Sequence, residues 1–166
     1  GRQRSIASSS WLPKRDVRVY ERSTQKWTML SPAGGKAVSH GALTVERKRS
    51  RLWLIGGDTS LQDGKIAATS MVMIFSLKTK LWAASTAKGA PPARSRHQIA
   101  MSDDEGHLYL HGGLLKSGAL DGQLWRLDVK KNLWELVSTP GERPTARAGA
   151  AMHAVAGQRR IVLFGG

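Results

Sequence analysis

The sequence predicts an all-β chain built from repeated four-stranded antiparallel sheets, and three observations predict it. Pairs of adjacent glycines begin at positions 56, 112 and 165, which are 56 and 53 residues apart. Three tryptophans, Trp27, Trp82 and Trp134, recur at 55 and 52 residues. Short β-rich runs separated by turn residues fill each period, and no segment has the apolar spacing of an amphipathic helix. Periods near 50 residues are typical of repeat architectures.

One period shows the expected strands clearly. They are SRHQIAMS (95–102), HLYLH (107–111), QLWRL (123–127) and LWELV (133–137). The segments between them, such as DDEG and DVKKN, are rich in turn-forming residues. A four-stranded sheet cannot cover both of its faces by itself, so neighbouring sheets must stack, and radial stacking gives a β-propeller. Each four-stranded sheet is called a blade below.

The glycine pairs and the tryptophans have different expected roles. Each glycine pair ends the second strand of a blade, where the backbones converge on the axis and a positive φ is needed. Each tryptophan follows a polar turn, and we expect the three at equivalent, mostly buried positions between blades. The residues with these expected structural roles are Gly56, Gly57, Gly112, Gly113, Gly165, Gly166, Trp27, Trp82 and Trp134.

These marks resemble the kelch family of β-propellers. The resemblance is carried by the glycine pairs, by the seven-residue spacing from Tyr20 or Phe75 to a tryptophan, and by the stretch PPARSRH that ends at His97. It extends over residues 17–166 and implies four-stranded antiparallel blades.

The kelch pattern is not uniform along the chain. Leu127 stands where the other repeats have an aromatic residue, Ala150 stands where His97 stands one repeat earlier, and Ala37 stands where an arginine is expected. These departures weaken the expectation of identical residues around the axis, but they leave the fold prediction intact.

The strands expected from the sequence do not complete a ring. Propellers close with about four to eight blades, so we expect an incomplete propeller with about three blades' worth of strands, either truncated or completed by a partner. The strands comprise the last two of one blade (17–30), two full blades (37–85 and 95–137) and the first two of another (148–164). The expected organisation is a basic, Ser-rich leader or linker (1–16) and a partial propeller (17–166), with repeats near 17–57, 58–113 and 114–166.

Composition limits the functional classes. The 166 residues contain no cysteine, which excludes disulfides, thiolate metal sites and a cysteine nucleophile. No apolar run approaches the roughly 20 residues of a membrane span, so we expect no membrane partner. The opening GRQRSIASSSWLPKR resembles a transit peptide, although an expression scar or an internal fragment would look similar. The compartment therefore stays open, with an intracellular location expected and the mitochondrion as the candidate that the opening stretch suggests.

The sequence contains no motif for catalysis or for a cofactor. His107 and His111 alternate on one strand, but no third metal ligand is evident, and we read them as ordinary strand histidines. The acidic turn Asp103–Glu105 lacks the rhythm of a calcium loop and is read as a solvated hairpin tip. There is no phosphate-binding loop and no dinucleotide fingerprint. We therefore expect a protein that is not an enzyme and that has no cofactor and no metal.

Two groups of residues are candidate binding sites. Resemblance to kelch proteins makes Arg94, Arg96 and His97 candidates for lining the axial channel and contacting a partner. The alternative, which we favour, is that Arg94 uses its fork of five donors on backbone carbonyls of the next blade.

The second group consists of basic residues on hairpin turns. Turns between strands one and two and between strands three and four fall at one edge of a blade, and twelve of the 26 lysines and arginines lie there. We call this side the turn edge. Polar hairpin tips are ordinary, and lysines at strand edges resist sheet addition. Neither fact explains why the charges on these turns are almost all positive. The predicted partner-binding residues are Arg47, Lys48, Arg49, Arg51, Lys78, Lys80, Lys130, Lys131, Arg159 and Arg160, with Arg22 and Lys26 on the same edge.

Two principal functions fit these observations. A net charge of +14 and a pI near 11 favour an anionic partner. The first function is a non-catalytic scaffold that mediates protein–protein interactions in a larger assembly, with a basic face for an anionic partner, for which we expect RNA ahead of an acidic protein. The second is an RNA-contacting subunit of a ribonucleoprotein, such as a mitochondrial ribosome. A propeller-based enzyme is a third class, because a fold alone does not fix function.

Overall fold

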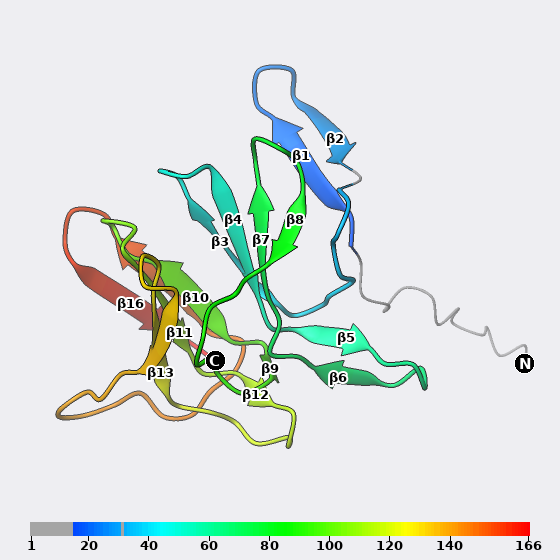
Figure 1. The fold of residues 1–166 in the computed structure, drawn as a ribbon. Coiled ribbons are helices and arrows are strands. Elements are labelled where there is room, and N and C mark those ends of the chain that lie inside the picture. Colours follow the sequence, from blue (N-terminus) through cyan, green and yellow to red (C-terminus); the bar gives the residue numbers. More distant parts are fainter. Residues whose placement is uncertain (1–14, 31) are drawn as a thin grey trace, which may run out of the picture.

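The computed structural model describes residues 15–30 and 32–166, and every regular element in these ranges is a β-strand (Figure 1). The all-β architecture of antiparallel sheets expected from the sequence is confirmed. The chain forms two complete blades with one two-stranded hairpin at each end. The predicted leader (1–16) lies almost entirely outside the described residues, so its role stays a prediction.

The two complete blades share one strand order. The first contains β3 (Ala42–Glu46), β4 (Arg51–Ile55), β7 (Val72–Ser76) and β8 (Trp82–Ala84), hydrogen-bonded in that order. The second contains β10 (Gln98–Met101), β11 (His107–His111), β13 (Leu124–Asp128) and β14 (Leu133–Leu136). All neighbouring strands are antiparallel.

Hairpins flank these blades, and two small sheets extend them. The terminal hairpins are β1 (Val17–Glu21) with β2 (Lys26–Leu30), and β15 (Ala151–Val155) with β16 (Arg160–Phe164). The small sheets pair β5 (Asp58–Ser60) with β6 (Ile66–Ala68), and β9 (Arg94–Ser95) with β12 (Leu114–Leu115). The sequence did not predict these small sheets, because strand pairs of two or three residues are too short to show an alternation of apolar and polar residues.

The three tryptophans occupy equivalent places in the strand register. Each lies directly opposite the residue seven positions before it. These pairs are Tyr20 with Trp27, Phe75 with Trp82, and Leu127 with Trp134. The aromatic ring centroids are 5.4 Å apart in the first pair and 5.1 Å apart in the second. The predicted equivalence therefore holds for three repeats.

The prediction that all three tryptophans are mostly buried is wrong for Trp27. Trp134 is buried and its backbone N–H donates to Lys88 O at 2.8 Å, in the connection from the preceding blade. Trp82 is half-buried and makes the same bond to Ala33 O at 3.2 Å. Trp27 is exposed, because β1 and β2 have no inner strands and no preceding blade within the described residues.

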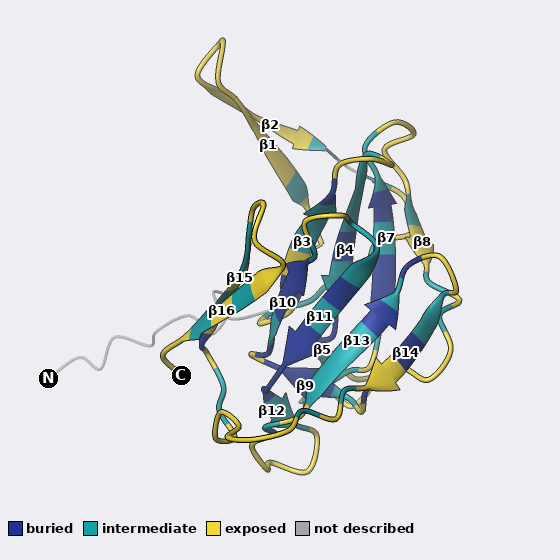
Figure 2. Ribbon diagram, turned by 90° about the vertical axis from the view of Figure 1, so that its left-hand side faces the viewer, coloured by how far each residue is buried: buried dark blue, intermediate teal, exposed yellow. Residues whose placement is uncertain are grey.

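The core lies between the two complete blades. Trp53 and Ile55 of β4 pack in one cluster with Leu108 and Leu110 of β11 and Leu127 of β13. Figure 2 shows this buried interior and the exposed outer hairpins. Period-two alternation of apolar residues places these side chains on facing surfaces.

Two of the predicted glycine positions show why only glycine fits. Gly56 has φ +55°, and a Cβ built on it would lie 2.6 Å from Arg94 O. Gly112 has φ +70°, and its Cβ would lie 2.5 Å from Arg147 O. The chain thus needs a left-handed conformation at a place where the next backbone segment leaves no room for a side chain.

No helix in the described ranges is long and apolar enough to cross a membrane.

Candidate functional site

Arg94 is buried where two strands of the second blade converge. Its Nη1 donates to Asp121 Oδ2 at 2.6 Å and to Gly112 O at 2.9 Å, and its Nε donates to Pro92 O at 3.1 Å. The Gly112 carbonyl belongs to the same blade as Arg94, and not to the next blade as the sequence reasoning supposed. Arg94 thus ties the start of the blade to the end of its second strand.

Arg147 repeats this arrangement one blade later. Its Nη1 donates to Gly165 O at 2.9 Å, as Arg94 does to Gly112 O. Arg147 was missed by sequence reasoning, although it follows Arg94 by the same 53 residues that separate Gly112 from Gly165. The backbone is linked in the same way, because Gly57 N donates to Arg94 O and Gly113 N donates to Arg147 O, both at 2.8 Å.

Arg96 and His97 have contrasting environments. Arg96 is exposed with φ +56°, and its backbone bridges the repeats by accepting from Gly149 N and donating to His40 O. His97 is almost fully buried. Burial, followed by the positive charge of Arg94, lowers the pKa of His97 to about 4. A neutral, enclosed imidazole at this position packs the blade junction, which leaves Arg96 as the exposed member of the three.

The acidic turn Asp103–Glu105 is a hairpin tip with Asp103 and Asp104 exposed, as expected, and it also connects neighbouring turns. The carboxylate of Glu105 accepts from Arg47 N at 3.0 Å and from Lys48 N at 2.7 Å. On the other side, Asp103 Oδ2 accepts from Gly157 N at 2.8 Å. Carboxylates of one turn therefore satisfy backbone donors of the turns on both sides, which aligns the tips along the turn edge.

Glu46 removes two arginines from the predicted basic surface. Its buried carboxylate accepts from Arg51 Nε at 3.0 Å, from Arg49 Nη1 at 2.8 Å and from Trp53 Nε1 at 2.9 Å. Burial raises the pKa of Glu46, but hydrogen bonds from Trp53, Arg49 and Arg51 outweigh burial and hold the pKa below its usual value. Arg49 and Arg51 therefore act as structural counterions.

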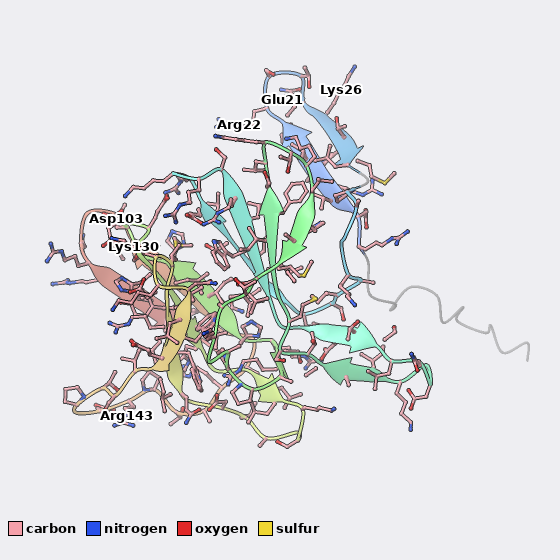
Figure 3. The ribbon with its side chains drawn as sticks, viewed as in Figure 1. Glu21, Arg22, Lys26, Asp103, Lys130 and Arg143 are labelled. Atoms are coloured by element: carbon pink, nitrogen blue, oxygen red, sulfur yellow. The ribbon has the colours of Figure 1, made fainter. Side chains whose placement is uncertain are left out.

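The other turn-edge cations divide into engaged and unengaged groups. Lys48 Nζ donates to Asp104 O at 2.7 Å, and Lys131 Nζ lies 3.7 Å from Asp128 Oδ2. Figure 3 labels Lys130 and Asp103, and it shows Arg22 and Lys26 on the β1–β2 hairpin. Within the described residues, the predicted cations whose side chains have no ion pair and no hydrogen bond are Arg47, Lys78, Lys80, Lys130, Arg159 and Arg160.

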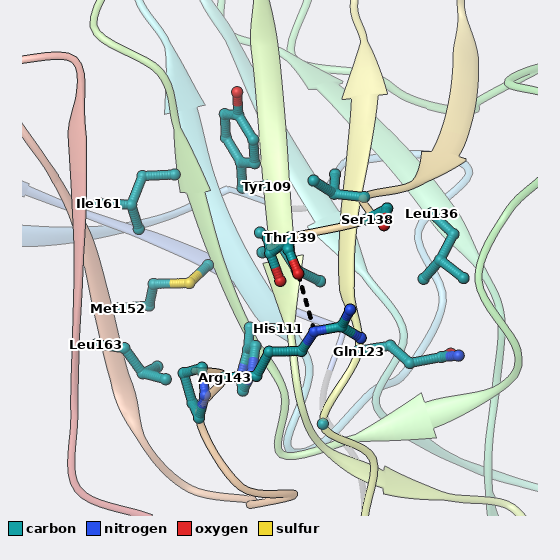
Figure 4. A pocket seen from close by; sticks show the side chains of 14 residues that line it. Tyr109, His111, Gln123, Leu136, Ser138, Thr139, Arg143, Met152, Ile161 and Leu163 are labelled. Carbon is teal, nitrogen blue, oxygen red and sulfur yellow. Dashed lines mark hydrogen bonds between the residues drawn. The ribbon is translucent and has the colours of Figure 1, made fainter. Parts of the chain in front are cut away.

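A pocket of about 360 Å³ lies between the second blade and the β15–β16 hairpin (Figure 4). Tyr109 of β11 lines it on one side, and Ile161 and Leu163 of β16 line it on the other. Arg143, whose Nε donates to Thr139 O at 3.1 Å, borders it. The lining is mainly apolar, and no group of three or more His, Cys, Asp or Glu in the described part of the chain could hold a metal ion.

Comparison with known proteins agrees with this repeat geometry. The family described as the KLHDC2/KLHL20/DRC7 Kelch-repeats domain matches residues 7–166. The chain belongs to the kelch-repeat family. The resemblance inferred from the glycine pairs and tryptophans is therefore confirmed. Kelch-repeat domains in general are protein-interaction scaffolds.

Individual relatives contain this kelch region within longer chains. Acyl-CoA-binding domain-containing protein 4 of Arabidopsis thaliana is 29% identical over 150 residues, which is 90% of this chain and 22% of that protein. Kelch-like protein 38 of Homo sapiens is 28% identical over 154 residues, which is 92% of this chain and 24% of that protein. The chain thus spans less than a quarter of the length of these relatives.

A solved kelch propeller, YjhT, shares the fold. It superposes with a TM-score of 0.65 at 19% identity, over 79% of this chain and 46% of that chain. At this level of identity the likeness concerns the fold alone.

Proposed function

We propose that this kelch chain is a non-catalytic interaction scaffold whose turn edge binds an acidic protein surface. One observation carries the proposal, namely that the charge on this edge is unevenly neutralised. Glu46 and Asp128 engage Arg49, Arg51 and Lys131. Six other predicted partner-binding cations form no side-chain ion pair or hydrogen bond among the described residues, and neither do Arg22 and Lys26 on the same edge.

The unengaged cations come from several repeats. Lys78 and Lys80 lie on the β7–β8 turn, Lys130 lies on the β13–β14 turn, and Arg159 and Arg160 lie at the β15–β16 turn. Acidic contacts join the β10–β11 turn to the β3–β4 and β15–β16 turns, and the β7–β8 and β13–β14 turns lie at the same edge of their blades. Like charges gathered on one surface repel one another, and an anionic partner relieves this repulsion when it binds. Exposed charge of one sign also accelerates association with a partner of opposite charge.

RNA is the second candidate partner. The overall charge of +14 favours it, since lysine and arginine bind phosphates without reading sequence. The two partners differ in their expected salt response. Phosphate binding should lose affinity with a log–log slope of about −0.7 per neutralised phosphate of a single strand, whereas a protein interface that also buries apolar surface should depend less steeply on salt.

The test compares two double charge reversals. Lys78→Glu with Lys130→Glu alters the turn edge, and Lys65→Glu with Lys116→Glu alters loops away from it. Each reversal removes two charges, so both variants change the net charge from +14 to +10. Binding to poly-L-glutamate and to a single-stranded RNA of about 20 nucleotides and mixed sequence is measured by fluorescence anisotropy. The salt concentration is varied between about 50 and 300 mM, because salt screens the interactions of exposed charges.

The turn-edge variant should lose about tenfold more affinity than the loop variant for the preferred probe, because only its charges are clustered. Tighter binding of polyglutamate than of RNA supports the acidic protein partner, and tighter binding of RNA supports the ribonucleoprotein alternative. Equal effects of the two variants would show that net charge alone attracts the probes, and would overturn a specific role for the turn edge.

A further inference from the structure

The turns between the first and second strands of three successive repeats differ in charge. The β3–β4 turn reads RKRS (47–50), the β10–β11 turn reads DDEG (103–106), and the β15–β16 turn reads AGQR (156–159). An acidic turn thus lies between two basic turns. Its carboxylates contact both neighbours, since Glu105 binds the β3–β4 turn and Asp103 binds the β15–β16 turn.

Glu105 is bound by two successive backbone amides of the β3–β4 turn. Its Oε1 accepts from Arg47 N at 3.0 Å, and its Oε2 accepts from Lys48 N at 2.7 Å. Successive N–H groups of a turn form a concave anion-binding site, and hydrogen bonds from N–H groups to a carboxylate are among the stronger ones in proteins. We call this pair of donors the amide site. It holds both oxygens of one carboxylate, which identifies the chemistry that it binds.

The amide site borders a pocket between the two complete blades. The pocket has a volume of about 250 Å³, and Lys48 and Glu105 line it together with Lys130 of the β13–β14 turn. Every residue that lines the pocket belongs to one of these two blades. The site is therefore formed where the turns of neighbouring blades meet on the turn edge.

The positive charge beside Glu105 is not used to neutralise it. Within the described residues, Glu105 forms no ion pair, and Lys130 forms neither an ion pair nor a side-chain hydrogen bond. Lys48 Nζ donates to the backbone carbonyl of Asp104 at 2.7 Å. Arg47, Lys48 and Lys130 are exposed, so their charge is accessible to a group from outside the chain.

We propose that the amide site binds an acidic side chain of the partner, and that Glu105 occupies the site when no partner is bound. This inference rests on the proposed function, because it names the position on the turn edge where the acidic protein surface binds. An aspartate or glutamate of the partner displaces Glu105 and accepts from Arg47 N and Lys48 N in its place. Lys130 then pairs with a second acid of the partner.

The balance between the two occupants favours a partner with several adjacent acids. Exchange of one carboxylate for another leaves the number of bonds to the two amides unchanged. Glu105 belongs to the same chain, so it competes at a high effective concentration, and an isolated acid displaces it poorly. A partner with neighbouring acids gains further contacts with cations that Glu105 leaves unpaired. Glu105 thereby selects for acidic clusters.

The first experiment removes the competing charge. Glu105→Gln keeps the size of the side chain, and Glu142→Gln makes the same change in the exposed connection between β14 and β15. Each variant loses one negative charge, so both change the net charge from +14 to +15. Affinity is measured by fluorescence anisotropy with a labelled peptide of about six glutamates, which spans about 20 Å when it is extended.

Glu105→Gln should bind the peptide about fivefold more tightly than Glu142→Gln, because a neutral amide competes less strongly than a carboxylate for the two N–H donors. Equal affinities of the two variants would overturn the proposal, since net charge alone would then account for both. Weaker binding by Glu105→Gln would also overturn it, because Glu105 would then support the partner site and not compete for it.

The same titrations separate this inference from the proposed function. Peptide binding by the unmodified chain, with equal affinities of the two variants, removes the amide site and leaves the acidic partner of the turn edge in place. Absence of peptide binding by the unmodified chain and by Glu105→Gln removes both.

Lys130→Gln tests the second contact. It should weaken peptide binding about threefold relative to Lys116→Gln, a matched change on a loop away from the turn edge, because Lys130 borders the amide site and its charge is unpaired. Both variants change the net charge from +14 to +13. Equal effects of the two lysine variants would exclude Lys130 from the site.

Nuclear magnetic resonance tests the amide site in the unmodified chain, independently of any effect of a substitution on folding. The backbone amide signals of Arg47 and Lys48 should shift saturably as the glutamate peptide is added. The amide of Lys65, which donates to Asp63 Oδ1 at 3.1 Å on the β5–β6 hairpin, is the matched control and should not shift. Unchanged Arg47 and Lys48 signals at saturating peptide would overturn the proposal. Larger shifts of these two signals with single-stranded RNA than with the peptide would overturn an acidic side chain as the occupant.

Discussion

Arg94 Nη1 lies 2.6 Å from Asp121 Oδ2, and this ion pair is enclosed where the second blade begins. Burial lowers the pKa of Arg94, and the charge of Asp121 opposes that effect. The same nitrogen holds the carbonyl of Gly112. An arginine that would otherwise be an exposed candidate for partner binding is thereby committed to joining strands of its blade.

Removing Asp121 should therefore destabilise the chain strongly. Asp121→Ala leaves the buried guanidinium of Arg94 without its counterion, and we expect the free energy of unfolding to fall by about 3–5 kcal/mol. Urea unfolding followed by tryptophan fluorescence measures this. Asp63→Ala removes an exposed carboxylate that pairs with Lys65, and this control should leave stability nearly unchanged because exposed ion pairs contribute little. Similar values for the two variants would contradict the structural role of the Arg94–Asp121 pair.

His97 should make stability depend on pH in the acidic range. The pKa of His97 is about 4 in the folded chain and 6.5 as an unperturbed side chain. The unfolded chain therefore binds the proton more tightly, so stability rises with pH between about 4 and 6.5 and is unaffected by this group above that range. The full loss on acidification amounts to about 3 kcal/mol. His97→Gln should flatten this part of the profile.

The glycine pairs should differ from other glycines with positive φ. Gly56→Ala introduces both a left-handed alanine and a clash with Arg94 O, so we expect a loss above about 3 kcal/mol. Gly64 has φ +78°, and a Cβ at this position would have nothing within 4 Å, so Gly64→Ala should cost only about 1–2 kcal/mol. Comparison of the two unfolding midpoints checks this, and equal losses would mean that the crowding at Gly56 is relieved by backbone movement.

The tryptophans should contribute unequally in a single chain. Trp134→Ala removes a buried indole side chain of the second blade, next to the connection from the preceding blade. We expect the free energy of unfolding to fall by about 3–5 kcal/mol. Trp27→Ala alters an exposed side chain and should change stability by less than about 1 kcal/mol. Both are measured by urea unfolding at the same protein concentration. A large effect of Trp27→Ala in the monomer would show contacts beyond those of the β1–β2 hairpin.

Much of the fold could be predicted because the repeat is encoded in local patterns. The seven-residue spacing from Tyr20 to Trp27 is the geometry of a tight antiparallel hairpin, and the same spacing recurs at Phe75 and Leu127. The Gly-Gly pairs reflect a steric limit that no other residue meets. Local alternation and turn chemistry therefore located the main strands of the second blade within a few residues and the extent of the first blade.

The candidate site was less predictable because its residues are chosen by contacts between blades. The basic turns were correctly placed on hairpin tips, but their sequence does not reveal that Glu46 binds Arg49 and Arg51, or that Glu105 caps the amides of the neighbouring turn. Arg147 could have been found from its 53-residue spacing to Arg94, whereas nothing local identifies Asp121 as the partner of Arg94.

The sequence by itself determined the period, the strand order within a blade and the positions where glycine is required, because these depend on interactions between residues close in the chain. Only the tertiary structure decided which charges are neutralised, since Arg94 and Asp121 are 27 residues apart and Lys48 and Glu105 are 57 residues apart. It also decided that Trp27, identical in register to Trp134, is exposed. Burial depends on the blade that packs against a residue, and that neighbour is not encoded in the repeat to which the residue belongs.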